Sequence, residues 1–125
     1  MKKALIIACL LGTLSVILGA FGAHSLKEKL DPNLLESFKT GVRYMFLHAI
    51  VILVINSIKL LNNKTLKLSN SFFFIGILFF TGSILAIVMG VPAKLIWFVT
   101  PLGGLILILG WLSLAYGVWR NKEIK

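Results

Sequence analysis

The chain has 125 residues, of which 58% are hydrophobic and 14% are charged, and its formal net charge is +9. This length allows one domain, and the composition excludes an ordinary soluble domain, in which apolar positions are interrupted because one face of each element meets water. The thirteen Lys and Arg residues lie at the edges of long apolar blocks and between them, which favours lipid headgroups over nucleic acid as the partner.

The apolar blocks are long enough to cross a membrane. A spanning helix needs about 20 apolar residues, and four stretches approach or exceed that length. They are residues 4–23, 44–61, 72–90 and 95–119. The expected fold is therefore all-α, a multi-pass membrane protein whose single domain covers residues 1–125.

The first of these stretches also resembles the start of a secretory signal peptide. Met1-Lys2-Lys3 is followed by an apolar run, and the small residues near its end offer a cleavage site. The run from 4 to 23 is nevertheless 20 residues long, whereas a signal core has about 7–15. We therefore predict a retained first helix.

The segment between the first two spans carries a helix start. Asp31 provides an acceptor for free N–H groups, and Pro32 suits the first helical position. Apolar residues then recur at intervals of three and four. They are Leu35, Phe38, Val42 and Met45. This pattern predicts an amphipathic helix over residues 32–43 at the outer membrane surface, with a bend at Gly41 before the second span.

Small residues recur every seven positions in three of the spans, which returns them to nearly the same helix face. They are Gly12 and Gly19; Gly76, Ser83 and Gly90; and Gly103, Gly110 and Gly117. Helices in lipid associate by close packing and buried polar bonds, so these positions predict helix–helix contacts. A ligand groove lined by Gly103 and Gly104 is the alternative.

Pro101 lies inside the fourth predicted span. Its missing N–H removes a hydrogen bond to the carbonyl of Trp97, so we expect a kink there. The neighbouring Thr100 and glycines leave open a hinge or an exposed backbone for an ion.

The distribution of Lys and Arg predicts the orientation. With four spans, both termini and the middle connection share one side, which carries eight of these residues against five on the other. The eight are Lys2, Lys3, Lys59, Lys64, Lys67, Arg120, Lys122 and Lys125, and the five are Lys27, Lys29, Lys39, Arg43 and Lys94. We expect both termini in the cytoplasm and the protein in a bacterial inner membrane.

No acidic residue lies within a predicted span, although proton and cation carriers usually place one there. The four acids are Glu28, Asp31, Glu36 and Glu123. No nucleophile–base–orienter set or phosphate loop is present, so we expect no enzymatic activity and no cofactor. His24 and His48, with Asp31 or Glu36, leave a metal site open, but their spacing matches no metal-ligand pattern.

Several motifs carry a family resemblance. They are Leu18-Gly19-Ala20-Phe21-Gly22-Ala23-His24-Ser25-Leu26, Leu30-Asp31-Pro32, Phe38-Lys39-Thr40-Gly41-Val42-Arg43-Tyr44, His48-Ala49, Thr81-Gly82-Ser83, Thr100-Pro101-Leu102-Gly103-Gly104 and Gly110-Trp111. The chain closely resembles the domain-of-unknown-function 423 family, which includes bacterial inner-membrane proteins of the YgdD and YwdK type; animal transmembrane protein 256 looks related. The resemblance implies a four-span topology with a retained first helix, and it brings no activity or cofactor.

The motif residues gather toward the outer side, which makes that side the first candidate for a functional patch. Its members are His24, Glu36, Arg43, Tyr44 and His48. Arg43 has Glu36 or a lipid phosphate as its expected ionic partner, and His48 is expected to hydrogen-bond to a neighbouring helix.

Two functions follow as hypotheses. The first is a non-enzymatic protein that packs into a homo-oligomer or against a membrane-protein partner and assists membrane assembly or integrity. The second is an oligomeric channel or transporter for a small solute or ion, because four helices rarely enclose a pore alone. Its polar lining would be Asn56, Thr81, Ser83 and Thr100.

Overall fold

A computed structural model describes residues 1–59 and 61–121 of the chain. Within these ranges the protein is helical and has no strand. The helices are α1 (Lys2–Ala23), α2 (Pro32–Ser57), α3 (Asn63–Val88), the short α4 (Ala93–Ile96) and α5 (Val99–Arg120). Four segments are long and apolar enough to cross a membrane, the fourth formed by α4 and α5 together, so the predicted four-span, all-α fold is confirmed. Lys122, Glu123 and Lys125 lie outside the described residues.

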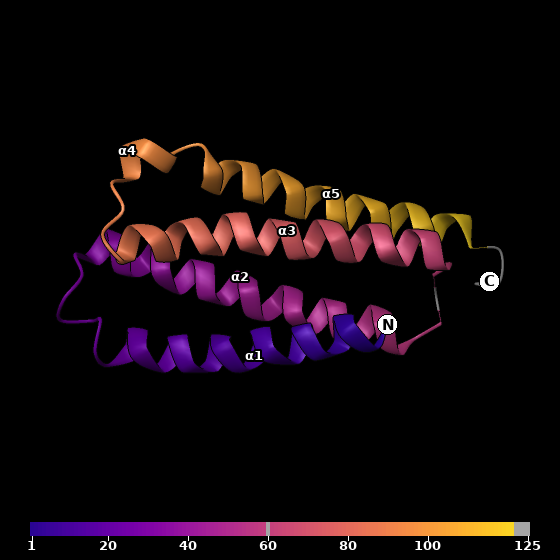
Figure 1. Ribbon diagram of the computed structural model, residues 1–125, viewed down its shortest axis with the longest axis horizontal. Helices are drawn as coiled ribbons and strands as arrows, with labels where there is room; N and C mark the ends of the chain where they lie inside the picture. Colours follow the sequence, from indigo (N-terminus) through magenta and orange to yellow (C-terminus); the bar gives the residue numbers. More distant parts are fainter. Residues whose placement is uncertain (60, 122–125) are drawn as a thin grey trace.

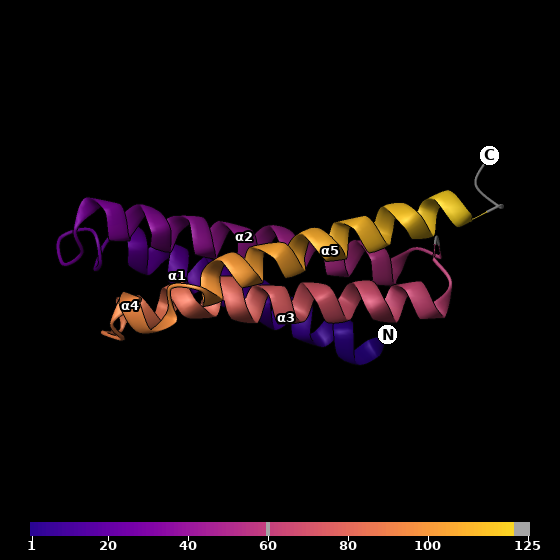
Figure 2. The same ribbon diagram turned by 90° about the horizontal axis from the view of Figure 1, so that it is seen from above.

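The four long helices lie side by side in chain order (Figure 1). The extensive contacts join α1 to α2, α2 to α3 and α3 to α5, and Figure 2 shows that the helices are inclined to one another. Met1 and the end of α5 lie at one end of the molecule, here called the terminal end; the 24–31 segment and α4 lie at the other, here called the hairpin end (Figure 1). Consequently α1 and α5 are the two edge helices of an open arrangement.

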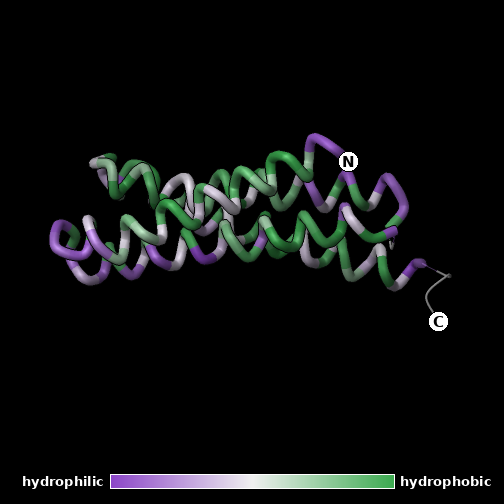
Figure 3. Tube along the Cα trace, turned by 90° about the horizontal axis from the view of Figure 1, so that it is seen from below, coloured by the Kyte–Doolittle hydropathy of each residue, from purple (hydrophilic) through white to green (hydrophobic). Residues whose placement is uncertain are grey.

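The outward surface of this arrangement is apolar along its length. Leu10 in α1 is 63% exposed, Leu78 in α3 is 66% exposed and Leu105 in α5 is 59% exposed. Figure 3 shows hydrophobic residues along the helices and hydrophilic segments at both ends. Such a surface is compatible with hydrocarbon and not with water, which is the physical basis of the membrane assignment.

The interior is a thin apolar core to which every long helix contributes. Phe73 of α3 and Ile52 of α2 are fully buried at its centre. The other buried members are Ala8, Met45, Ile55, Leu66, Ile77 and Leu107. Because packing at close distance drives helix association in lipid, this core fixes the order of the helices.

The predicted surface helix over residues 32–43 does not exist as a separate element. It begins where expected, because Asp31 Oδ1 accepts hydrogen bonds from the backbone N–H groups of Asn33 (3.0 Å) and Leu34 (3.1 Å). From Pro32, however, α2 continues without interruption to Ser57. The apolar stripe that suggested a lipid-facing surface is buried against protein, with Phe38 2% exposed. The helix is not interrupted at Gly41, which packs on α3 with its carbonyl accepting a hydrogen bond from Thr81 Oγ1 (2.8 Å).

The fourth span also differs from the expected single kinked helix. The helix is interrupted at Trp97 and Phe98, between α4 and α5. Pro101 is therefore the third residue of α5, in a first turn whose N–H groups have no intrahelical partner, and its missing N–H costs nothing there. The preceding turn is made by Gly90, whose φ of 107° favours glycine.

Candidate functional site

The structure separates the residues of the predicted outer patch. His24 follows the last turn of α1 and is exposed. Glu36 pairs with Lys39 at 3.4 Å on the exposed side of α2, so the expected pairing of Glu36 with Arg43 is absent. His48 is buried, whereas Tyr44 is 40% exposed and its ring stacks on Phe80 of α3. The five residues thus do not form one site.

His48 has both ring nitrogens engaged. Nδ1 lies 2.7 Å from the carbonyl oxygen of Tyr44, and the indole N–H of Trp111 in α5 donates to Nε2 at 3.1 Å. A carbonyl only accepts and an indole N–H only donates, so Nδ1 carries the proton and Nε2 carries the lone pair. This is a neutral imidazole that bonds α2 to α5, and neither nitrogen is left for a metal ion.

Aromatic rings surround this hydrogen bond. The ring of Tyr44 stacks on Phe80 with centroids 4.9 Å apart and an interplanar angle of 19°. The ring of Phe73 lies 5.4 Å from His48 and 5.8 Å from Trp111. These offset and edge-on contacts are the arrangements that aromatic rings prefer, so the cluster stabilises the crossing of α2, α3 and α5.

The four residues predicted to line a polar pathway are bonded to other helices. Asn56 and Asn70 exchange two amide hydrogen bonds of 2.9 and 3.0 Å between α2 and α3. Thr81 donates to the Gly41 carbonyl, and the hydroxyls of Ser83 and Thr100 lie 2.5 Å apart between α3 and α5. Among the described residues, no buried side-chain polar atom lacks a partner. These groups therefore join helices within the chain.

The predicted small-residue contacts divide into two groups. The first group lies between α3 and α5, where the two backbones approach closely. A Cβ at Gly103 would overlap the backbone of Phe79 and Phe80, and a Cβ at Gly110 would lie 2.7 Å from the Phe73 ring. Gly117 faces Thr65 and Leu61, and Gly76 faces Leu107 in the same way.

The second group makes no such contact within the described residues, so helix–helix contacts at these positions stay a prediction. A Cβ at Gly12, Gly19 or Gly90 would meet no atom within 4 Å. The side of α1 that faces α2 is formed instead by Ala8, Ser15 and Gly22, which are also seven residues apart and buried. This stripe lies only about 40° around the helix from Gly12 and Gly19, which is why the sequence did not distinguish them.

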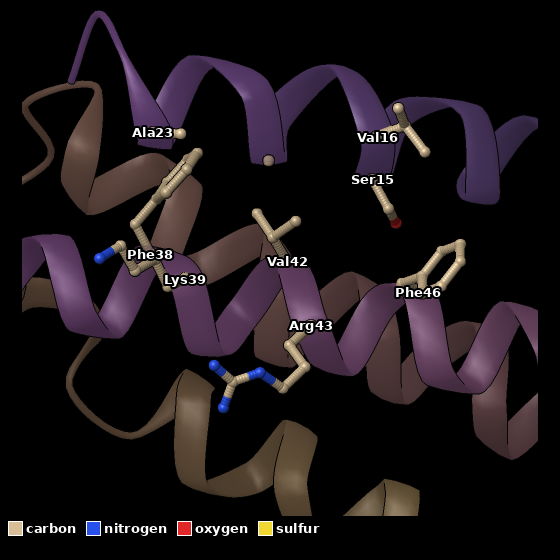
Figure 4. A pocket seen from close by; sticks show the side chains of 9 residues that line it. Ser15, Val16, Ala23, Phe38, Lys39, Val42, Arg43 and Phe46 are labelled. Carbon is tan, nitrogen blue, oxygen red and sulfur yellow. The ribbon is translucent and has the colours of Figure 1, made fainter. Parts of the chain in front are cut away.

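A groove of about 280 Å³ lies between α1 and α2. Figure 4 shows Phe38, Val42 and Phe46 of α2 turned toward α1, where Val16 and Ala23 form the other wall. Lys39 and Arg43 border the same groove; the guanidinium of Arg43 extends away from α1 (Figure 4). Because α2 is continuous, these two cations lie alongside an apolar span, from which long side chains reach the headgroups.

No metal centre is assembled by the described residues. Nowhere in the described ranges do three or more His, Cys, Asp or Glu side chains come together. His24 is at the end of α1 and His48 is inside the helix bundle, bonded to Trp111. The geometry therefore offers no support for the hypothesis of a shared histidine site.

Sequence reasoning missed the partners of the polar residues. They are Asn70, Ser69, Ser113 and Trp111. Asn70 lies two residues before the predicted third span, outside the stretches that the hydropathy pattern singles out. Trp111 is in the middle of α5, eight or more residues from either end, and an indole N–H at that depth needs an acceptor. That requirement was the available signal.

Comparison with known proteins places the chain among membrane proteins. Residues 18–104 match the family described as "Protein of unknown function (DUF423)". The chain is 38% identical over 123 residues to a UPF0382 membrane protein of Haemophilus influenzae, covering 98% of each. It is 34% identical over 116 residues to the UPF0382 membrane protein YwdK of Bacillus subtilis, covering 91% of this chain and 94% of YwdK. No solved structure matches the chain.

Proposed function

This chain belongs to the DUF423 family of membrane proteins, and we propose that it serves membrane assembly or integrity, without catalysing a reaction, by associating with a second copy of itself through α1. The observation that carries the proposal is that α1 is attached to the rest of the chain by packing alone. It is an uncharged edge helix from Ala4 onward, it packs mainly on α2, and the described residues give it no side-chain hydrogen bond to another helix.

The free flank of α1 is lined by small side chains. Gly12 and Gly19 leave space that no part of the chain fills, and Thr13 and Ala20 lie beside them. Their size is not explained by packing within the chain, whereas small residues in lipid allow the backbone of another helix to approach. A seven-residue interval suits a left-handed crossing of two α1 helices.

The groove of Figure 4 adjoins this flank. Gly19 and Ala23 are among its lining residues, opposite Val42 and Phe46. Side chains of a second α1 helix fit such a groove as knobs fit holes. Two copies related by a two-fold axis along the membrane normal present the same surface to each other, as a closed dimer requires.

We propose that the terminal end faces the cytoplasm of a bacterial inner membrane. Lys2, Lys3, Lys59, Lys64, Lys67 and Arg120 lie at this end of the described chain, and an excess of Lys and Arg marks the cytoplasmic side. A thiol introduced at Asn63 is expected to react with a membrane-impermeant maleimide only after the cells are opened. Each thiol is introduced singly in a Cys9→Ser background. If intact cells were labelled at Asn63→Cys but not at Ser25→Cys, the terminal end would face the outside instead.

Cys9 provides the test of association. It is the only cysteine, it is exposed on α1, and it lies three residues before Gly12. Oxidative cross-linking of native membranes is expected to give a covalent species of twice the monomer mass. Gly12→Leu is expected to reduce that species severalfold, and Ala115→Leu, an equally bulky change on the exposed face of α5, is the matched control.

The outcomes separate the alternatives. Absence of the dimer, or equal loss with Gly12→Leu and Ala115→Leu, would contradict association through α1. A Cys9 cross-link to a different protein would show that α1 associates with another partner and not with a second copy. Solute flux into liposomes that Asn56→Leu or Thr100→Val abolishes, in variants that still fold, would favour the channel hypothesis instead.

A further inference from the structure

A second cavity is lined by residues of α3 and α5 and by none of α1. It has a volume of about 630 Å³, is placed between α3 and α5 at the terminal end, and opens to the exterior. Its rim carries the cations Lys64 and Arg120, and its wall includes Leu68, Leu109 and Leu112. One cavity thus combines positive charge with an apolar surface.

The two kinds of residue are ordered along the membrane normal. Lys64 is the second residue of α3 and Arg120 is the last residue of α5, so both lie at the boundary of the span. At a rise of about 1.5 Å per residue, Leu68 lies about 6 Å and Leu112 about 12 Å farther into the membrane. A phospholipid has the same order, with its phosphate at the boundary and its acyl chains beneath.

The cationic groups at the rim are positioned to bind an anion. Arg120 Nη1 donates to the phenol oxygen of Tyr116 at 3.2 Å, and its guanidinium carbon lies 5.7 Å from the centroid of that ring. This holds the guanidinium at the cavity and leaves its other N–H groups to bind oxygen atoms. Among the described residues, no carboxylate lies at this end, since Glu28, Asp31 and Glu36 are all near the hairpin end.

We propose that this cavity binds one phospholipid with an anionic headgroup. Lys64 and Arg120 contact the phosphate, and one acyl chain lies along Leu68, Leu109 and Leu112. The apolar wall selects a lipid over free phosphate, because burial of the chain adds to the ionic contact. A second copy of the protein fits less well, because the described residues of this end offer it cations only. The site lies on α3 and α5 and does not depend on the proposed association through α1.

The test is native mass spectrometry of the full chain in detergent, titrated with phosphatidylglycerol or with phosphatidylcholine of the same acyl chains. One bound phosphatidylglycerol is expected at concentrations where phosphatidylcholine leaves the site largely empty. Lys64→Gln and Arg120→Gln are each expected to weaken phosphatidylglycerol binding about fivefold. Lys67→Gln, one turn along α3 and outside the cavity, is the matched control and is expected to change binding less than twofold.

Three results would overturn the proposal. They are equal binding of the two lipids, equal losses in all three variants, and displacement of the lipid by glycerol phosphate at the same concentration. The first two would show diffuse attraction without a site, and the third would show a site for free phosphate. All three substitutions are at exposed positions, so the fold is preserved, and Cys9 cross-linking in the same variants reports the association separately.

Discussion

Two helix pairs of this protein meet by different means. Between α3 and α5 the glycine backbones of α5 contact α3 directly, and hydroxyl groups pair across the contact, Ser69 with Ser113 at 2.6 Å and Ser83 with Thr100. Between α1 and α2 the contact is made by small and apolar side chains alone. The hydroxyls of Thr13 and Ser15 bond to carbonyls of their own helix, those of Cys9 and Leu11.

The difference shows which helices the chain itself holds in place. Lipid tails are as apolar as the helices, so association depends on close packing and on polar bonds. The α3–α5 pair has both, α2 is attached to it by the Asn56–Asn70 and His48–Trp111 bonds, and α1 has packing only. We therefore expect substitutions at helix contacts to reduce the unfolding free energy most in α5 and least in α1.

The largest effect is expected for Gly103→Ala. The added methyl group would overlap the backbone of Phe80 in α3, an overlap that is relieved only if α3 and α5 move apart, and we expect a loss of about 3 kcal/mol in unfolding free energy. Titration with sodium dodecyl sulfate, followed by circular dichroism, measures it. Gly104→Ala is the control, because its methyl group would lie 3.8 Å from the Phe80 ring, an ordinary contact. Equal stability of the two variants would contradict the close contact between the backbones of α3 and α5 at Gly103.

A smaller effect is expected for Asn56→Leu. It removes two hydrogen bonds to Asn70 and leaves that amide without its partner, at a cost of about 1.5 kcal/mol. The double variant with Asn70→Leu is expected to lose less than the sum of the single losses, since the two residues interact. Ser57→Ala, whose hydroxyl bonds only within α2, should be near neutral. Additive losses would mean that the amide pair does not couple the helices.

Trp111→Phe tests the bond between α2 and α5. It keeps an aromatic ring beside Phe73 and removes only the donor to His48, so the expected loss is about 0.6 kcal/mol. Trp119→Phe is the control at the end of the same helix, where the side chain is 81% exposed. Nitrogen-15 spectra of the imidazole should show a proton on Nδ1 in the wild type. A proton on Nε2 would contradict the donor assignment.

The smallest effect on stability is expected for Gly12→Leu. Because the added Cβ would meet no atom within 4 Å beyond the neighbouring backbone of its own helix, the unfolding free energy should change by less than about 0.5 kcal/mol. The same substitution is expected to reduce cross-linking through Cys9. A large loss of stability would show instead that α1 is held as firmly as α5, and would remove the contrast between the two regions.

The sequence by itself determined the elements and their medium. Long apolar runs form helices in lipid because every backbone polar group must be bonded within its own segment, so the number of spans follows from composition and length. Local chemistry placed the start of α2 at Asp31-Pro32. In α5 the seven-residue glycine interval correctly indicated the face that contacts α3. The only glycines among residues 105–119 are Gly110 and Gly117, and both lie on that face.

Only the tertiary structure decided which faces and which polar groups meet. In α1 two stripes of small residues lie close together around the helix, and the choice between them rests on Phe38, which fills the space beside Gly22. The continuity of α2 depends on Thr81 and Ile84 of α3 packing at Gly41. The partner of His48 is 63 residues away. Such pairings depend on contacts between distant segments, whereas helix formation in a membrane depends on each segment alone.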